Sequence, residues 1–152
     1  MKIYKKGPIG ALASEYENAL IELKAYLVTI PNNTFTNVEN DSAPKEFQSA
    51  RNIVLHVVNS GYIYVNHIRK RLGKETILYT FDIQTTKEAI VELDKMFEYT
   101  LSAFEDLWEF TYSDLMHTII KTSWTTYDLE ALIEHAIVHV LRHHRQIERT
   151  IN

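Results

Sequence analysis

The chain has 152 residues, of which 45% are apolar and only 4 are Gly and 3 are Pro. This composition suits long helices, so we expect one domain that spans residues 1–152. The chain has no Cys, which excludes disulfides and thiolate metal sites, so any metal must be held by His, Asp or Glu. Its net charge of −4 argues against nucleic acid as the main partner, because binding phosphates needs a concentrated positive field.

The N-terminus carries basic residues with no apolar segment behind them, which is not the pattern of a secretory signal. No apolar run approaches the roughly 18 residues that a membrane span needs. We therefore expect a cytoplasmic protein that does not enter a membrane.

The first 48 residues predict one helix and a long connection. Apolar residues recur at spacings of three and four from Ile9 to about Ile30, which is the period of a helix. Pro31 ends this run, because proline does not continue a helix. Residues 31–48 hold two Pro and four Asn, and they are long enough to cross a helical bundle.

A second helix is predicted from Ser49, a favourable N-cap residue, to Leu72. Gly73 follows the last predicted residue of this helix, at the position where helices often end in a left-handed residue, usually glycine. A second connection covers residues 73–84. The last turns carry a cluster of cations: Arg69, Lys70, Arg71 and Lys74. We interpret these cations as charges stabilised by the negative end of the helix dipole, in preference to an anion or nucleic-acid site.

A third helix is predicted from Thr85 to about Glu109. Thr85 and Glu88 have the spacing of a capping box, and the apolar residues after them keep the helical period. This helix has no histidine, and its acidic residues are interpreted as a solvated face.

The remaining residues predict a fourth helix after an irregular segment. Residues 111–125 are expected to form a packed loop or a single helical turn. Thr125 or Thr126 is the predicted cap of a helix that runs to about Ile151, with Asp128 in its first turn. Four helices with long crossover connections predict an all-α fold, a four-helix bundle.

The fourth helix carries three histidines spaced by four residues, His135, His139 and His143. Measured on a helical wheel, His143 lies about 60° from the centre of the apolar face, His139 about 100° and His135 about 140°. One metal cannot use His135 and His143 together, because about 12 Å separates them along the axis. A pair at positions i and i+4 can share a metal, and the pair of His139 and His143 points further inward.

Two other histidines of this helix, His144 and His135, are expected to have different roles. His144 falls on the opposite shoulder of the apolar face from His143, so we expect it to be a partly buried, hydrogen-bonded core residue. His135 is expected to lie exposed or at a rim rather than to bind metal directly.

The second helix offers a third ligand, either His56 or His67. Both lie on one flank of the helix, but about 16 Å separates them along the axis, so only one can join the pair. Spacing alone leaves this choice open. A ferritin-like dinuclear site is excluded because no Glu stands three residues before a histidine, and the His-Glu-x-x-His signature of metalloproteases is absent.

Two segments of the chain resemble the DinB-like family (DinB/YfiT-like) of small four-helix bundles, and the resemblance covers essentially the whole chain. The first segment is 50–60, which contains His56. The second runs from 126 to 147 and ends in His139-x-x-x-His143 followed by His-Arg-Gln-Ile. Many members end this motif His-Arg-Gly-Gln-Ile, whereas this chain has no Gly there and keeps Gln146 three residues after His143.

The resemblance implies the ligands and the class of chemistry. In the family one His comes from the second helix and two come from the last, which here favours His56 over His67 and gives His56, His139 and His143 as the metal ligands. It also implies a divalent metal ion, zinc or nickel, and a homodimer. Members of known activity are thiol-dependent S-transferases and isomerases that use low-molecular-weight bacterial thiols, so the implied partner is a small-molecule substrate; DNA binding is not implied.

These expectations lead to two hypotheses. In the first, the three neutral imidazoles bind one ion facially and leave positions at which water or a thiol is activated, for hydrolase or S-transferase chemistry. No general base is assigned, although Glu134 and Asp128 lie on the last helix, and Gln146 either orients a ligand imidazole or is a surface amide.

In the second, the protein is a non-catalytic bundle that binds metal or a small ligand and acts as a dimeric interaction module. The lack of an assigned base supports it, as do the 9 Tyr, 6 Phe and 2 Trp, which suit a ligand pocket as well as a core.

Overall fold

Helices dominate the computed structural model, which describes residues 3–151, so the predicted all-α class is confirmed. The four long helices are α1 (Pro8–Thr29), α3 (Ala50–Arg71), α4 (Thr86–Phe104) and α6 (Leu129–Ile151). The shorter elements are the helices α2 (Asn32–Thr36) and α5 (Tyr112–His117), the 3-10 helix η1 (Lys45–Phe47), and the strands β1 (Ile119–Lys121) and β2 (Thr126–Asp128).

The predicted caps fix the ends of α3 and the start of α4. The Ser49 side chain accepts a hydrogen bond from the backbone N–H of Asn52, and Thr85 and Glu88 form the full capping box. Gly73 has φ 69°, in the left-handed region. Its N–H donates to Lys70 O at 3.2 Å, and the N–H of Lys74 donates to Arg69 O at 2.9 Å, so the last carbonyls of α3 are satisfied. Ser49, Gly73 and Thr85 therefore set these boundaries as predicted.

The segment before α6 differs from the prediction. Residues 111–125 are neither a loop nor a single turn: they contain α5, begun by a capping box of Thr111 and Asp114, and strand β1. The expected cap at Thr125 or Thr126 is wrong, because β2 pairs antiparallel with β1 and keeps residues 126–128 extended. The cap is Asp128, whose Oδ1 accepts from the N–H of Ala131 at 2.8 Å.

Helix α4 also ends earlier than predicted. It stops at Phe104 rather than near Glu109, and residues 105–109 form turns. The side chain of Leu107 is buried although it lies beyond the helix end. The helical spacing of apolar residues in the sequence therefore continues past the last residue of α4.

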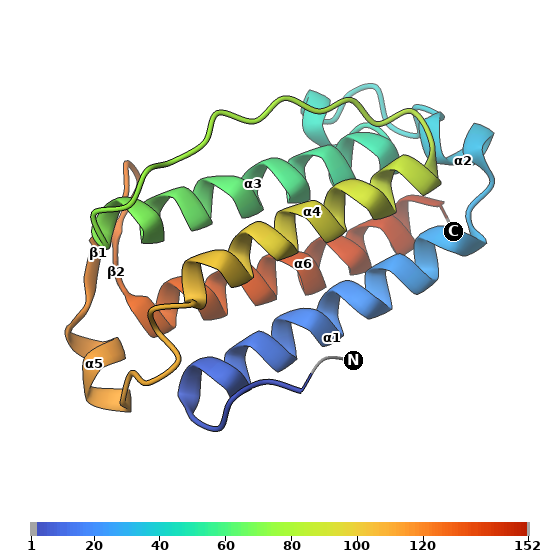
Figure 1. Cartoon of the computed structure of the whole chain (residues 1–152). Helices are drawn as coiled ribbons and strands as arrows, with labels where there is room; N and C mark the ends of the chain where they lie inside the picture. Colours follow the sequence, from blue (N-terminus) through green and yellow to red (C-terminus); the bar gives the residue numbers. More distant parts are fainter. Residues whose placement is uncertain (1–2, 152) are drawn as a thin grey trace.

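The four long helices lie side by side, and α3 and α4 point in the same direction while α1 and α6 point in the opposite one (Figure 1). Helix α3 packs against α4 and α6, and α1 packs against the same two helices. Their buried apolar side chains form one continuous core. Helices α3 and α6 are therefore direct neighbours along their length, which allows side chains from the two to meet.

The two long connections take different courses. Residues 31–48 do not cross the molecule; they stay at the end where α1 finishes and α3 begins (Figure 1). The crossover is the extended segment 73–84, which runs back along α3 to the start of α4. Because 31–48 stays local, η1 packs on α3 beside its first turns.

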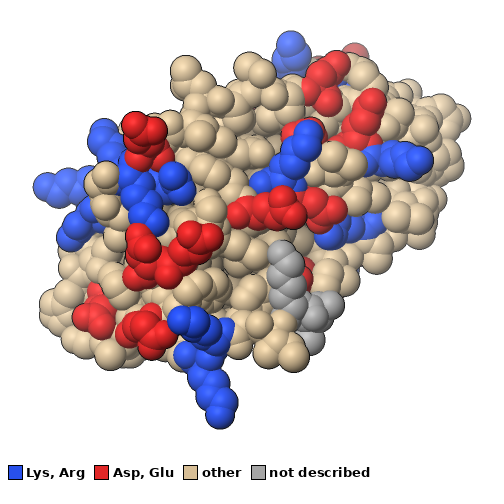
Figure 2. Space-filling model, viewed as in Figure 1, with Lys and Arg blue, Asp and Glu red and all other residues tan. Residues whose placement is uncertain are grey.

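The cations at the end of α3 contact backbone and acidic groups. Arg69 Nε donates to Glu75 O at 2.7 Å, Arg71 Nε donates to Ile119 O at 2.9 Å, and Lys74 pairs with Asp106. On the face that Figure 2 shows, basic and acidic side chains adjoin one another rather than forming one continuous basic surface. These contacts agree with a structural interpretation of the cluster.

Within residues 3–151, none of the helices combines the length and the apolar character that crossing a membrane would require.

Candidate metal centre

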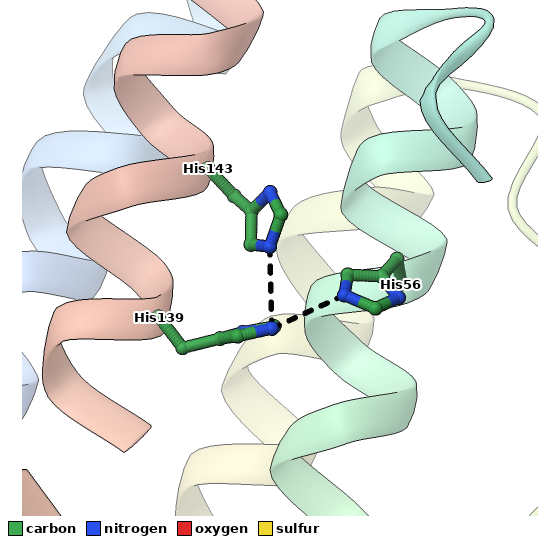
Figure 3. A group of neighbouring side chains, drawn as sticks. All are labelled: His56, His139 and His143. Carbon is green, nitrogen blue, oxygen red and sulfur yellow. Dashed lines mark hydrogen bonds between the residues drawn. The ribbon is translucent and has the colours of Figure 1, made fainter. Parts of the chain in front are cut away.

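Three histidines from two neighbouring helices meet between α3 and α6. His56 lies in the second turn of α3, and His139 and His143 lie one turn apart on α6. Figure 3 shows the three rings pointing toward one another across the space between these helices. The ligand set expected from the sequence is thus brought together in one place.

The atoms that converge are the Nε2 nitrogens. His139 Nε2 lies 3.1 Å from His56 Nε2 and 3.2 Å from His143 Nε2 (Figure 3), and the potential ligand atoms of all three residues lie within 4.8 Å of one another. Nitrogens bound to one tetrahedral zinc at the usual bond lengths of about 2.0–2.1 Å are themselves about 3.3 Å apart. Two of the three separations therefore already have the spacing that a shared ion requires.

Burial keeps these imidazoles neutral. His143 is 1% exposed and His139 is 6% exposed, while His56 is half-buried. Burial, followed by the neighbouring His143 and His56, lowers the pKa of His139 from 6.5 to about 3. Burial likewise lowers the pKa of His143 to about 4 and lowers the pKa of His56. Neutral imidazoles with free lone pairs are the form that binds a metal ion.

Two residues of α6 fix the tautomer of His143. Arg142 Nη2 lies 3.1 Å from His143 Nε2, and because a guanidinium only donates, Nε2 must be the acceptor. The proton of the neutral ring then sits on Nδ1, which donates to Gln146 Oε1 at 2.7 Å. Gln146 is therefore the residue that orients this imidazole rather than a surface amide, and it keeps Nε2, which lies 3.2 Å from His139 Nε2, unprotonated.

One aromatic residue of η1, Phe47, covers part of the site. Phe47 stacks on the ring of His143 with centroids 5.7 Å apart and meets the edge of His56 at 5.3 Å. Phe47 lies in the 31–48 connection, where no sequence periodicity marks it. Its position follows from the packing of η1 on α3.

A groove opens beside His56. It has a volume of about 680 Å³, and its lining comes from η1, α3 and the crossover segment, including Lys45, Glu46, Asn52, Tyr79 and Phe81. This groove gives a small molecule access to the His56 side of the site.

Carboxylates take no part in the ligand group. Asp128 is occupied in capping α6, and Glu134 is exposed on the same helix. Glu46 lines the groove beside His56, and its charge raises the pKa of that ring against the larger effect of burial. Glu46 lies in a connection without periodicity, and for this reason it could not be placed near the site from the sequence.

The other histidines of residues 3–151 are outside the ligand group, although the ring of His135 lies 6.2 Å from that of His139. His67 meets Trp124 edge-on at 5.5 Å, and His135 is half-buried beside Tyr64. His144 is buried as expected and lies against Tyr26, but its Nε2 has no hydrogen-bond partner within residues 3–151. The expectation of a hydrogen-bonded His144 is therefore wrong for this nitrogen.

Comparison of the chain with protein-family models, with curated proteins and with solved structures finds no match. The chemistry of the site must therefore be inferred from its own geometry.

Proposed function

We propose that the protein is a metal-dependent enzyme of the DinB-like type, built on a four-helix bundle with long crossover connections. In this proposal His56, His139 and His143 hold one divalent ion, zinc or nickel, and the site acts on water or on a low-molecular-weight thiol. The observation that carries the proposal is the convergence of three neutral imidazole nitrogens, two of whose separations, 3.1 and 3.2 Å, match those around a single ion.

A divalent ion at this position supplies a Lewis acid that lowers the pKa of water or of a thiol. The residues of the chain supply the rest. Gln146 keeps a proton on Nδ1 of His143, so that its Nε2 is always the ligand atom, and the Phe47 ring shields that imidazole from bulk water. Three protein ligands leave at least one position open for a reactant, as in catalytic rather than structural zinc sites.

The groove beside His56 supports the enzyme hypothesis. A cavity of about 680 Å³ falls within the range of small-molecule sites, and its lining combines the aromatic rings of Tyr79 and Phe81 with polar side chains. A substrate bound there has its reacting end beside His56.

The second candidate is a non-catalytic bundle that binds metal or a small ligand and acts as a dimeric interaction module. It is favoured by one observation: of the two carboxylates expected on the last helix, Asp128 caps α6 and Glu134 is exposed. The homodimer and the cytoplasmic location stay predictions in both hypotheses.

Metal content tests the proposal first. We expect purified protein to bind about one equivalent of zinc or nickel, measured by inductively coupled plasma mass spectrometry after gel filtration. Less than about a tenth of an equivalent of any transition metal, with no uptake on adding zinc or nickel, contradicts it.

Turnover separates the enzyme from the module. The metal-loaded protein is assayed for transfer of small thiols to 1-chloro-2,4-dinitrobenzene and for hydrolysis of 4-nitrophenyl acetate. Metal-dependent turnover in either assay that is lost on chelation supports the enzyme, and one bound equivalent without turnover favours the module.

A further inference from the structure

We propose that Arg142 anchors an anionic group of the substrate beside the three histidines, so that the site selects anionic substrates over neutral ones of the same size. This inference rests on the proposed function and deepens it, because it names a substrate class and the residue that recognises it.

The position of Arg142 is the first observation. Its Nη2 donates to His143 Nε2 at 3.1 Å, and this is the same nitrogen that would bind the metal. One lone pair cannot serve both, so metal binding releases the guanidinium from His143. Arg142 is exposed, and its side chain is therefore able to reorient beside His143.

The second observation is that Arg142 has no acidic partner. Its neighbour Arg145 donates to both carboxylate oxygens of Glu148, at 2.9 and 2.8 Å. Among the ion pairs formed by residues 3–151, none includes Arg142. Once released from His143, its planar set of donors is available to a carboxylate or another oxyanion.

The third observation is the charge of the site. The three ligands are neutral imidazoles, so a divalent ion keeps its full double charge, and Arg142 adds a further positive charge. The charge of Arg142 lowers the pKa of all three ligand histidines, which shows that it acts on the whole site. Glu46, whose charge raises the pKa of His56, opposes this field with one negative charge, so the bound ion and Arg142 together keep the site positive, which favours an anionic reactant.

A purely structural role for Arg142 does not account for these contacts. Gln146 already fixes the tautomer of His143 through Nδ1, at 2.7 Å, and it does so without occupying the ligand nitrogen. Arg142 instead donates to Nε2 of His143, the nitrogen that a bound metal would occupy. Its role is therefore expected in the metal-loaded state.

The test uses the full chain loaded with cobalt(II), kept free of oxygen, and two thiols of equal length. 3-Mercaptopropionate carries a carboxylate and 3-mercapto-1-propanol is neutral, and the binding of each is followed by the thiolate-to-cobalt absorption band. We expect the wild-type protein to bind the anionic thiol about 10-fold more tightly, as a charge-assisted pair at a partly screened site allows. Arg142→Gln should reduce this preference to within about 2-fold while the affinity for the neutral thiol is kept.

Arg145→Gln is the matched control. It also removes one positive charge, three residues along the chain from Arg142, but from a side chain that is already paired with Glu148, so it should keep the preference for the anionic thiol. Arg142→Gln should also bind cobalt at least as tightly as the wild-type protein, because Nε2 of His143 is no longer shared. If the preference for the anionic thiol survives in Arg142→Gln, or if wild-type protein takes up cobalt but shows no preference, the role of Arg142 is overturned while the metal site stands. Wild-type protein that takes up no cobalt overturns the metal site and this inference with it.

Discussion

Helices α3 and α6 carry histidines at two levels of the molecule, and among residues 3–151 three rings converge at only one of them. Toward the start of α3, the rings of His56 and its two partners converge on one point. Toward its end, His67 and His135 also belong to the two helices, yet Trp124 lies against the first and Tyr64 lies against the second. Two adjacent helices therefore bring their histidines into one candidate ligand group where the rings meet directly, as the Nε2 atoms of His56 and His139 do at 3.1 Å.

The hairpin β1–β2 supplies aromatic residues that contact the histidines of the second level. Trp124 sits in its turn and donates from Nε1 to the Tyr127 hydroxyl at 3.0 Å, and Tyr127 in turn lies 3.5 Å from His135 Nδ1. At the other level the covering residue is Phe47, which stacks on the outside of His143 and leaves the space between the three rings open.

The largest expected effect distinguishes the two levels directly. Replacing His56 by Ala removes one of three ligands and should weaken zinc binding by about 3 kcal/mol or more, which is at least about a hundredfold, given about 10–16 kcal/mol for a complete site. The matched variant His67→Ala should change zinc affinity by less than about twofold. Competition titration with a chromophoric chelator measures both, and the reverse order of effects would show that the third ligand is misassigned.

Acid should destabilise the metal-free protein through the same histidines. In the unfolded chain they protonate near pH 6.5, while in the fold the pKa is about 3 for His139 and about 4 for His143. The unfolded state thus binds more protons below pH 6.5, so the free energy of unfolding should fall, by about 3 kcal/mol between pH 6.5 and 5 for two such groups.

Urea denaturation across this pH range measures the effect. The double variant His139→Gln/His143→Gln is the control and should show a flatter dependence, while the other histidines with lowered pKa values, His56, His67, His135 and His144, remain in both proteins. Carboxylates with lowered pKa values, such as Glu88 and Asp114, lose their contribution only at more acidic pH and do not obscure this window. A wild-type curve as flat as that of the control would contradict the burial of neutral imidazoles.

The sequence predicted the helices well because their signals are local. Ser49, Gly73 and Thr85 satisfy backbone groups within a few residues of themselves, so their positions do not depend on the rest of the fold. The three-residue strands β1 and β2 gave no such signal, because their pairing is set by tertiary contact. Because strand β2 was not predicted, the cap of α6 was expected at Thr125 or Thr126 instead of Asp128.

The candidate site was predictable in part for the same reason. The spacing of His139 and His143 is a property of one helix, and the wheel correctly made His143 the more buried of the two. The choice between His56 and His67 depended on a family resemblance, because in the structure it is decided by the packing of α3 on α6 in opposite directions, which brings His56 to His139.

A smaller effect is expected from the residue that orients His143. Gln146→Leu removes the acceptor for Nδ1–H and should weaken zinc binding 10- to 100-fold, the usual range for such partners. Gln146→Glu restores an acceptor and should recover most of the affinity. Isothermal titration calorimetry of the two variants provides the comparison, and equal losses in both would show that packing rather than the hydrogen bond is responsible.

The smallest effect should come from the hairpin. Trp124 is 48% exposed and contacts His67 but none of the three ligands, so Trp124→Ala should leave zinc affinity and the stoichiometry of one unchanged. A second equivalent of zinc in this variant, measured by the same titration, would show that Trp124 alone keeps the other histidines from forming a site.

The most direct test of the central claim is zinc K-edge X-ray absorption of the zinc-loaded full chain. Our account predicts one zinc per chain with a first shell of nitrogen and oxygen at about 2.0–2.1 Å and outer-shell scattering from three imidazoles. In His139→Ala this scattering should be lost together with the bound zinc. A wild-type protein that retains no zinc, or one whose spectrum lacks imidazole scattering or is the same in His139→Ala, would contradict a metal centre formed by His56, His139 and His143.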